Sequence, residues 1–343
     1  MTARAAPDVV KNILVVGAGL IGARHLRMVR DHPGCRLAGV VDPHIGLDPD
    51  VPQFGAIADV DVPVDGAIIA TPTQLHAEHG IAAAKRGWHI LMEKPVASDV
   101  AEAQALRAAV DRYGVRCIVG HHRRYHASVQ RLREVIAQGQ IGAPVTATLI
   151  WAVRKPDSYF DAAWRATGGS PIMINLVHDI DLLRYVLGEV TDVVGLGSGL
   201  QRNADRIESG GAVLRFASGA CATISFADTA PSPWGFEAGT AENPNIASTG
   251  QDMWWTTGTR GGIAFPSLTC WSGSEDWSNA PTPHQFDAAK TIPLEAQLTH
   301  FLDVIKGDAT PLIDIRDATE TLRVTTALQN AIAPTLTASK EDD

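Results

Sequence analysis

Residues 11–22, K-N-I-L-V-V-G-A-G-L-I-G, decide the fold class. The first half of the stretch is a continuous apolar run rich in β-branched residues, which is typical of a strand buried on both faces of a parallel sheet. The second half fits the pattern G-x-G-x-x-G. In that pattern the first glycine permits a tight turn, the second lets the backbone approach a pyrophosphate, and the third lets a helix pack on the strand. The stretch therefore predicts the start of a dinucleotide-binding sheet, although a glycine-rich turn without a ligand would share the pattern.

An acidic residue ends the next predicted strand. Asp42 follows the apolar run of residues 36–41 and lies twenty residues beyond Gly22. A carboxylate at that distance is placed to accept hydrogen bonds from the adenosine ribose hydroxyls. Its negative charge would repel a 2′-phosphate, and no arginine follows it directly, so the sequence predicts NAD rather than NADP. The alternative is that Asp42 is only a turn residue before Pro43.

Strands and helices alternate through the rest of the first third of the chain. Strands are predicted at 64–70, 88–92 and 115–120, and helices at 76–86 and 101–113. This alternation is typical of a doubly wound parallel α/β sheet, here with about six strands.

The predicted strand at 88–92 carries Glu93, Lys94 and Pro95 at its C-terminal end. Ligands of doubly wound sheets bind at the carboxyl ends of the strands. A lysine held there, with a proline stiffening the chain after it, can donate or accept a proton. A surface lysine after an edge strand would give the same tripeptide, so this prediction depends on the cofactor pattern upstream.

Length and charge limit the class of protein. At roughly 150 residues per domain, 343 residues predict two domains. The formal net charge of -9 argues against a general binder of nucleic acid or of anionic membranes, because both need a basic surface. The four cysteines have no metal-ligand spacing, and no run approaches the ~18 apolar residues of a membrane helix. We expect a cytoplasmic protein without a metal, because no carboxylate or cysteine at ligand spacing joins His122 and His126.

Several motifs together resemble one family, the Gfo/Idh/MocA oxidoreductases, which include glucose-fructose oxidoreductase and myo-inositol dehydrogenase. The matching pieces are G-A-G-L-I-G with His25 after it, T-P-T-x-x-H at 71–76, E-K-P at 93–95, V-G-H-H-R-R-Y at 119–125, W-R at 164–165 and the run at 168–185. The resemblance covers nearly the whole chain, and the order and spacing of the motifs make it specific.

The resemblance implies a two-domain enzyme. Residues 1–124 would form a Rossmann domain that binds a nicotinamide cofactor. Residues 125–343 would form an α+β domain whose large, mostly antiparallel open sheet faces partner subunits in a homodimer or homotetramer, with the active site between the domains. Family members mostly transfer a hydride between nicotinamide and a secondary carbinol of a sugar, polyol or related cyclic compound. We therefore expect an NAD-dependent dehydrogenase acting on such a carbinol or on a hemiacetal hydroxyl.

Site residues follow from the motifs and from the resemblance. Residues expected to bind the cofactor are Gly17, Gly19, Leu20, Ile21, Gly22, Asp42, Thr71, Pro72, His76, Glu93, Lys94, Trp164 and Arg165. Residues expected to contact the substrate are Lys94, His122, Tyr125, Arg154, Trp164, Asn175 and His178. Aromatic rings suit the carbon faces of a sugar and guanidinium groups suit its oxygens, although aromatics can equally fill a loop core. Lys94, His178 and Asn175 are the expected catalytic residues. Lys94 and His178 would handle the proton, with family precedent favouring Lys94 as the main base.

A helix predicted over residues 172–187 carries Asn175 and His178, which are three residues apart and would share a face. The family pattern places an aspartate four residues before this histidine, where this chain has Ile174. The departure removes a carboxylate that would orient the histidine, and leaves Asn175 as its nearest substitute. Asp179 and Asp181 are expected to be surface or structural acids.

Later segments predict the second domain less sharply. Strands are expected at 145–153, 193–200, 211–216 and 220–226, and helices at 127–138, 293–305 and 315–332. Five tryptophans between residues 228 and 290 could cover the substrate or form a subunit interface.

Two other functions fit the same cofactor pocket. One is a hydrolase that retains NAD and breaks a glycosidic bond by transient oxidation, and the other is a regulator without catalysis.

Overall fold

The computed structural model describes residues 10–44, 46, 50–161, 169–202 and 206–338. The chain divides into two compact units. The first comprises Met1–His122 and Pro293–Leu322, and the second comprises Arg123–Ile292 and Arg323–Asp343. We expected the domain boundary after residue 124, which is two residues beyond the point where the chain passes from the first unit to the second. It did not include the return of residues 293–322 to the first unit, because an amphipathic pattern does not say which sheet a helix covers.

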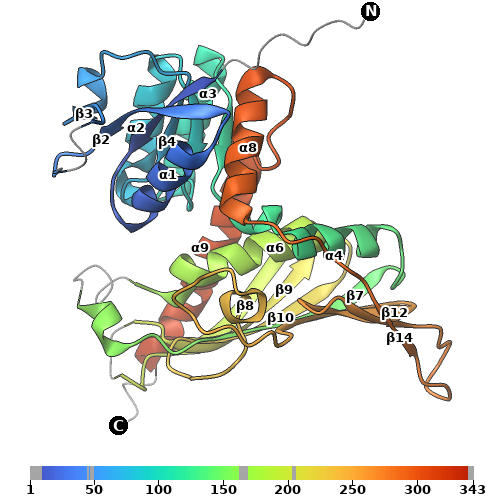
Figure 1. The fold of residues 1–343 in the computed structure, drawn as a ribbon. Coiled ribbons are helices and arrows are strands. Elements are labelled where there is room, and N and C mark those ends of the chain that lie inside the picture. Colours follow the sequence, from blue (N-terminus) through green and yellow to red (C-terminus); the bar gives the residue numbers. More distant parts are fainter. Residues whose placement is uncertain (1–9, 45, 47–49, 162–168, 203–205, 339–343) are drawn as a thin grey trace, which may run out of the picture. The chain divides into compact units, whose positions relative to one another are not determined.

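A six-stranded parallel sheet forms the first unit (Figure 1). Its strands are β1 (Lys11–Val16), β2 (Cys35–Val41), β3 (Gln53–Phe54), β4 (Gly66–Ile69), β5 (His89–Met92) and β6 (Cys117–Val119). The strand order is β3-β2-β1-β4-β5-β6 and every pairing is parallel. The last four residues of β1 are buried, as expected for a strand covered on both faces. The predicted doubly wound sheet is confirmed.

Helices pack on this sheet. They are α1 (Leu20–Asp31), α2 (His76–Lys85), α3 (Val100–Tyr113) and α8 (Pro293–Lys306). The Asp99 side chain caps α3 by accepting from the Glu102 backbone N–H at 2.8 Å. Leu298 and Phe301 of α8 join the core that contains Ile13. A Cβ on Gly66 would lie 2.8 Å from the Ile305 side chain, so glycine permits this close approach.

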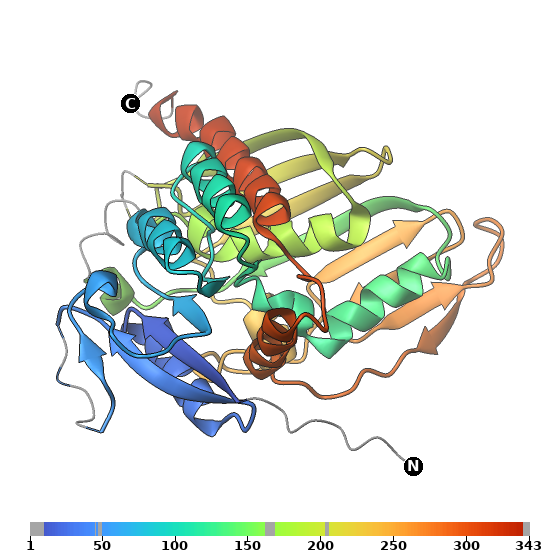
Figure 2. The same ribbon diagram turned by 90° about the horizontal axis from the view of Figure 1, so that it is seen from above.

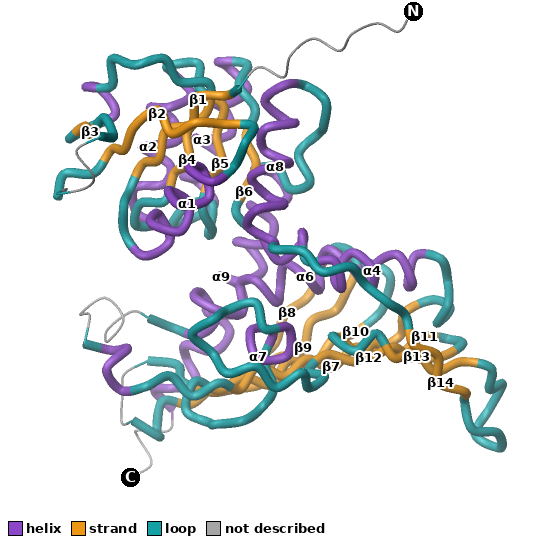
Figure 3. The backbone as a smooth tube through the Cα atoms, in the orientation of Figure 1, coloured by secondary structure: helices purple, strands orange, loops and turns teal. Residues whose placement is uncertain are grey.

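An eight-stranded sheet forms the second unit (Figure 3). Its strands are β7 (Pro144–Ala152), β8 (Val190–Ser198), β9 (Ser209–Phe216), β10 (Cys221–Ala227), β11 (Trp254–Gly258), β12 (Gly261–Phe265), β13 (Thr269–Ser272) and β14 (Thr282–Gln285). The order is β14-β13-β12-β11-β7-β10-β9-β8, and only β7 and β10 pair in parallel among these strands. The expected large, mostly antiparallel sheet is confirmed.

One face of this sheet carries helices (Figures 1 and 2). The helices of the unit are α4 (Ala127–Ala137), α6 (Val177–Leu187), α7 (Phe236–Thr240) and the later part of α9 (Ile315–Ala338). Ile180 of α6 and Leu328 of α9 share a core with Leu149 and Phe226 of the sheet. Val194 and Leu196 of β8 are instead 61% and 70% exposed.

None of the helices in the described ranges is long and apolar enough to cross a membrane.

Candidate functional site

The C-terminal edge of the parallel sheet gathers the segments that follow its strands. Residues 17–22 follow β1, Asp42 follows β2, residues 70–72 follow β4, and residues 93–95 follow β5. Because the strands are parallel, these segments lie at one edge, where ligands of doubly wound sheets bind. The order β2-β1-β4-β5 places the glycine-rich turn next to the point where the strand order reverses.

Each glycine of the turn has a separate structural reason. Gly17 has φ of +93°, and a Cβ there would lie 2.7 Å from the Ala70 carbonyl oxygen. A Cβ on Gly22 would lie 2.0 Å from the Gly17 carbonyl oxygen, so α1 can start this close to the turn only with glycine. A Cβ on Gly19 would meet no described atom within 4 Å, and the next residue, Leu20, is 80% exposed. The turn thus presents open backbone at a helix N-terminus, which fits a pyrophosphate.

Asp42 is held beside this turn. Its Oδ2 accepts from the Ala18 backbone N–H at 2.7 Å, and its Oδ1 accepts from the His44 N–H at 3.0 Å. A carboxylate has about four acceptor sites, so these two bonds leave capacity for ribose hydroxyls. The contact with Ala18 links the acid directly to the glycine-rich turn, which a mere turn residue before Pro43 would not need.

Glu93 is a buried carboxylate that fixes the backbone of Lys94. Its Oε1 lies 2.8 Å from His25 Nε2 on α1, and its Oε2 accepts from the Lys94 backbone N–H at 3.2 Å. Burial alone raises the pKa of Glu93, but the hydrogen bond to His25 and nearby positive charge, including that of Lys94, lower it to about 2. The contact with His25 was not predicted, because these residues lie 68 positions apart and only the motif was visible.

His76 ties together the loops that follow β4 and β5. Its Nδ1 lies 2.7 Å from the Pro95 carbonyl oxygen and its Nε2 lies 2.8 Å from the Thr71 carbonyl oxygen. Burial lowers the pKa of His76. The Lys94–Pro95 peptide is cis, and Lys94 itself is partly buried. His76 therefore supports the backbone next to Lys94, while its predicted contact with the cofactor stays a prediction.

Asn175 and His178 lie on two successive helical segments of the second unit. A π-helical segment, Ile172–Leu176, precedes α6, so the predicted α-helix over residues 172–187 is α-helical only from Val177. A π-helix bonds i to i+5, so the spacing of Asn175 and His178 does not have the α-helical geometry that we expected. The Asn175 Oδ1 is buried and has no hydrogen-bond partner among the described residues. His178 is 6% exposed.

Asp179 and Asp181 are both buried. They are therefore structural acids and not acids of the helix surface. Arg124 donates to both oxygens of Asp181, at 2.8 and 2.7 Å. Arg123 is shared, with Nη1 3.2 Å from Asp179 Oδ1 and Nη2 2.6 Å from Glu237 Oε1. Burial raises the pKa of Asp179 to about 7, because one shared guanidinium offsets it only in part and acidic neighbours, including Glu237, raise it further.

The remaining residues that we expected in the site differ in their exposure to solvent. His122 and Tyr125 are 7% and 5% exposed, and burial raises the pKa of Tyr125. The Arg154 side chain is half exposed and lies 3.8 Å from Asp157. Trp164 and Arg165 fall outside the described residues. In the described ranges, no group of three or more His, Cys, Asp or Glu side chains could hold a metal ion.

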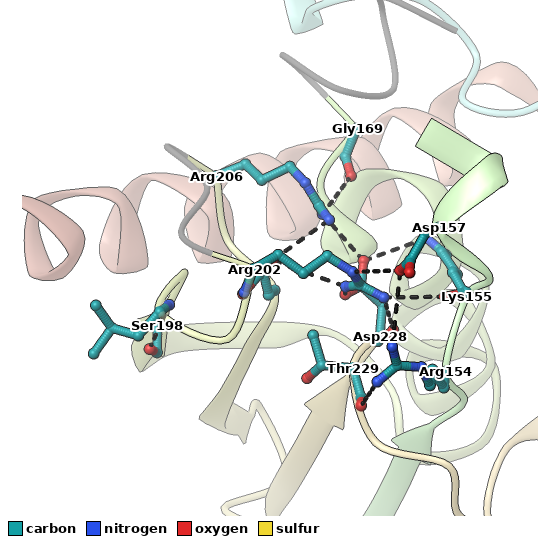
Figure 4. Close-up of polar contacts among 11 residues, drawn as sticks. Arg154, Lys155, Asp157, Gly169, Ser198, Arg202, Arg206, Asp228 and Thr229 are labelled. Carbon is teal, nitrogen blue, oxygen red and sulfur yellow. Dashed lines mark hydrogen bonds and ion pairs between the residues drawn. The ribbon is translucent and has the colours of Figure 1, made fainter. Parts of the chain in front are cut away.

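A charged cluster that we had not predicted lies where β7 and β10 end (Figure 4). We call it the Asp228 cluster, and its members are Lys155, Arg202, Arg206, Glu208 and Asp228. Side chains alternate between the faces of a strand, and Leu149 and Trp151 of β7 are buried. If that alternation continues past the end of the strand, Lys155 is on the buried face and its neighbour Arg154 is not. The sequence pattern therefore indicated a buried lysine at this position.

Comparison with known proteins agrees with this arrangement. Residues 11–121 match the model of an oxidoreductase family with an NAD-binding Rossmann fold, GFO_IDH_MocA, and residues 129–264 match the C-terminal domain model of the same family. A 1,5-anhydro-D-fructose reductase from Ensifer adhaerens is 34% identical over 182 residues, which are 49% of this chain and only 54% of that protein. The scyllo-inositol 2-dehydrogenase (NAD(+)) of Bacillus subtilis is 29% identical over 92% of both chains.

Solved structures show the same fold. The WlbA dehydrogenase from Bordetella pertussis, in complex with NADH and UDP-GlcNAcA, superposes with a TM-score of 0.74. The match covers 95% of this chain and 97% of that chain at 23% identity.

Proposed function

Because the chain belongs to the Gfo/Idh/MocA family of oxidoreductases, with an NAD-binding Rossmann domain, we propose that it is an NAD-dependent dehydrogenase. Its substrate is a secondary carbinol, or a hemiacetal hydroxyl, of a sugar, polyol or related cyclic compound. The observation that carries the proposal is the sheet edge that holds the glycine-rich turn, Asp42 and Glu93-Lys94-Pro95 on neighbouring strands. The names of the two relatives, which refer to an anhydro sugar and an inositol, support that substrate class.

The cofactor would be held by groups at this edge. Open backbone at Gly19 and the N-terminus of α1 would receive the pyrophosphate, and Asp42 would accept from the ribose hydroxyls. The fixed carboxylate of Asp42 disfavours a 2′-phosphate, which supports NAD over NADP. When bound, the nicotinamide supplies the hydride acceptor.

Lys94 and His178 exchange the proton with the substrate hydroxyl in this proposal. Glu93 holds the backbone of Lys94 and is itself held by His25, so the amine starts from a fixed backbone. The Oδ1 of Asn175, which has no hydrogen-bond partner among the described residues, accepts from a neighbouring substrate hydroxyl. Ile174 supplies no carboxylate, which supports Lys94 as the main base and His178 as its partner.

The test is a panel of sugars, polyols and cyclic diols with NAD, in which NADH formation is followed for wild type, Lys94→Ala and His178→Ala. We expect each variant to lose about 100-fold or more in kcat with a nearly unchanged Kd for NAD. Lys85→Ala is the matched control, because Lys85 is an exposed lysine of α2 in the same unit. Wild-type rates in both site variants would contradict the proposal.

A further inference from the structure

The Asp228 cluster contains more buried positive than negative charge. The side chains of Lys155, Arg202 and Arg206 are 9%, 17% and 5% exposed, whereas those of Asp228 and Glu208 are 0% exposed. Among the described residues, the cluster itself therefore has three cations and two carboxylates, and Glu237, a buried acid of α7, also acts on Lys155. Burying a cation costs free energy unless it is paired and hydrogen-bonded, so a buried amine without a hydrogen bond calls for an explanation.

Lys155 is the most loosely held cation of the described cluster. Arg202 Nη1 lies 2.6 Å from Asp228 Oδ1, and Arg206 Nη1 lies 3.1 Å from Asp228 Oδ2, so an arginine contacts each oxygen (Figure 4). Lys155 Nζ lies 3.9 Å from Oδ2, beyond hydrogen-bond distance. It has no hydrogen-bond partner within the part of the chain that the structure describes, although the residue is only 8% exposed.

Aromatic rings and an exposed acid lie beside these cations. Lys155 Nζ lies 4.8 Å from the centroid of the Tyr159 ring, and the Arg202 guanidinium lies 4.8 Å from that of Phe160. The Nε of Arg202 is a second buried donor without a described hydrogen-bond acceptor. Asp157 Oδ1 lies 3.7 Å from this Nε, and the Asp157 side chain is 81% exposed. These cation–π contacts hold the cationic donors in place, and such donors suit the acid group of a sugar acid.

The cluster is connected to the segment that carries the candidate catalytic residues. Arg206 Nη1 donates to the Gly169 carbonyl oxygen at 3.5 Å. Gly169 is followed by Ser170, whose Oγ accepts from the Ile172 N–H at 3.1 Å at the start of the segment that bears Asn175. An anion bound at Lys155 would therefore lie in the same unit as Asn175, and Arg206 of the same cluster contacts the chain three residues before the segment that bears Asn175.

We propose that Lys155, supported by Arg202 and Arg206, binds a carboxylate of the substrate, so that the substrate is a sugar acid or polyol acid. The Lys155 amine, which has no hydrogen-bond acceptor among the described residues, is a singly charged donor, which suits a carboxylate better than a dianionic phosphate. This inference rests on the proposed dehydrogenase function, because it names the substrate class of that site.

Binding tests the inference without relying on turnover. The NAD-loaded protein is titrated at pH 7 and constant ionic strength with matched pairs, D-glucuronate against D-glucose and D-galacturonate against D-galactose, and with inorganic phosphate. We expect at least one acid to bind about tenfold or more tightly than its neutral partner and more tightly than phosphate. Lys155→Met removes the charge and abolishes that preference. Lys290→Met, which removes an exposed lysine of the same unit, leaves it unchanged.

The variant is expected to fold, because methionine fills a similar volume and removes a buried amine that has no described acceptor. Its Tm without ligand should equal or exceed that of wild type. Acids that bind no better than neutral sugars, or a preference that survives in folded Lys155→Met, would overturn the inference, as would phosphate binding more tightly than every acid.

The two proposals fail separately. If acids bind through Lys155 but no compound yields NADH, the carboxylate subsite stands and the dehydrogenase proposal falls. If neutral sugars yield NADH and no acid is preferred in binding, the dehydrogenase stands and the subsite falls.

Discussion

Two buried carboxylates, Glu93 and Asp179, have pKa values that their surroundings shift in opposite directions. Glu93 is buried beside His25 and near the positive charge of Lys94, and these neighbours lower its pKa to about 2. Burial raises the pKa of Asp179 to about 7, and the guanidinium that it shares with Glu237 offsets this only in part. Neither pKa shift could be predicted from the sequence, because both depend on partners that lie more than 50 residues away.

Glu93 stabilises the fold at neutral pH. Its pKa in the folded protein lies below the ordinary value of 4.5, so its contribution is complete above about pH 4.5 and is lost as the pH falls toward 2. Glu93→Gln should lower the free energy of unfolding at pH 7 by on the order of 1–3 kcal/mol. Denaturant titrations of both proteins at pH 7 and pH 4 measure this. A difference that widens as the pH falls would contradict the assignment.

Asp179 should have the opposite effect. Its pKa in the folded protein lies above the ordinary value of 3.8, so ionisation costs stability as the pH rises from about 4 to about 7, and the cost is complete above that. Asp179→Asn keeps the shape and cannot ionise, so its unfolding free energy should fall less between pH 5 and pH 8 than that of wild type. Denaturant titration across this range checks the slope, and equal slopes for the two proteins would refute the prediction.

At the scale of elements, local patterns predicted what local sequence determines. The apolar run of residues 13–16 and the glycines after it predicted the first strand and its turn, and the alternation of strands and helices predicted the six-stranded parallel sheet. Three features depend on distant partners and were not predicted, namely the packing of α8 on the first sheet, the parallel pairing of β7 with β10, and the Asp228 cluster. The π-helical turn before α6 also has no periodicity that distinguishes it from an α-helix.

The glycine-rich turn allows binding and stability to be separated. Gly19 has a negative φ and open space at its Cβ position, so Gly19→Val should keep the Tm of wild type while the new side chain blocks the pyrophosphate. We expect its Kd for NAD to rise about tenfold or more. Gly22→Ala would place a Cβ 2.0 Å from the Gly17 carbonyl oxygen and should lower the Tm clearly. Thermal unfolding and NAD titration of both variants measure this. A clearly lower Tm for Gly19→Val together with an unchanged Tm for Gly22→Ala would contradict this description of the turn.

At the scale of the whole molecule, the larger sheet leaves apolar side chains on one open face. Val194, Leu196 and Val213 are 61%, 70% and 40% exposed. Exposed apolar patches mark interaction sites, and we propose that this face joins identical subunits in a homodimer or homotetramer. Leu196→Asp should then yield a smaller species by size-exclusion chromatography with light scattering. Tyr113→Asp, at an exposed position of α3, is the control. An unchanged mass for Leu196→Asp would place the interface elsewhere.

Hydride transfer to NAD is the central claim, and following the transferred hydrogen tests it most directly. The compound that gives NADH in the panel is prepared with deuterium on the carbon that is oxidised, and is incubated with the enzyme and NAD in ordinary water. Mass spectrometry of the released cofactor should show one deuterium per NADH, together with an oxidised product. Released NADH without deuterium, or consumption of a compound of the panel without any NADH, contradicts the claim.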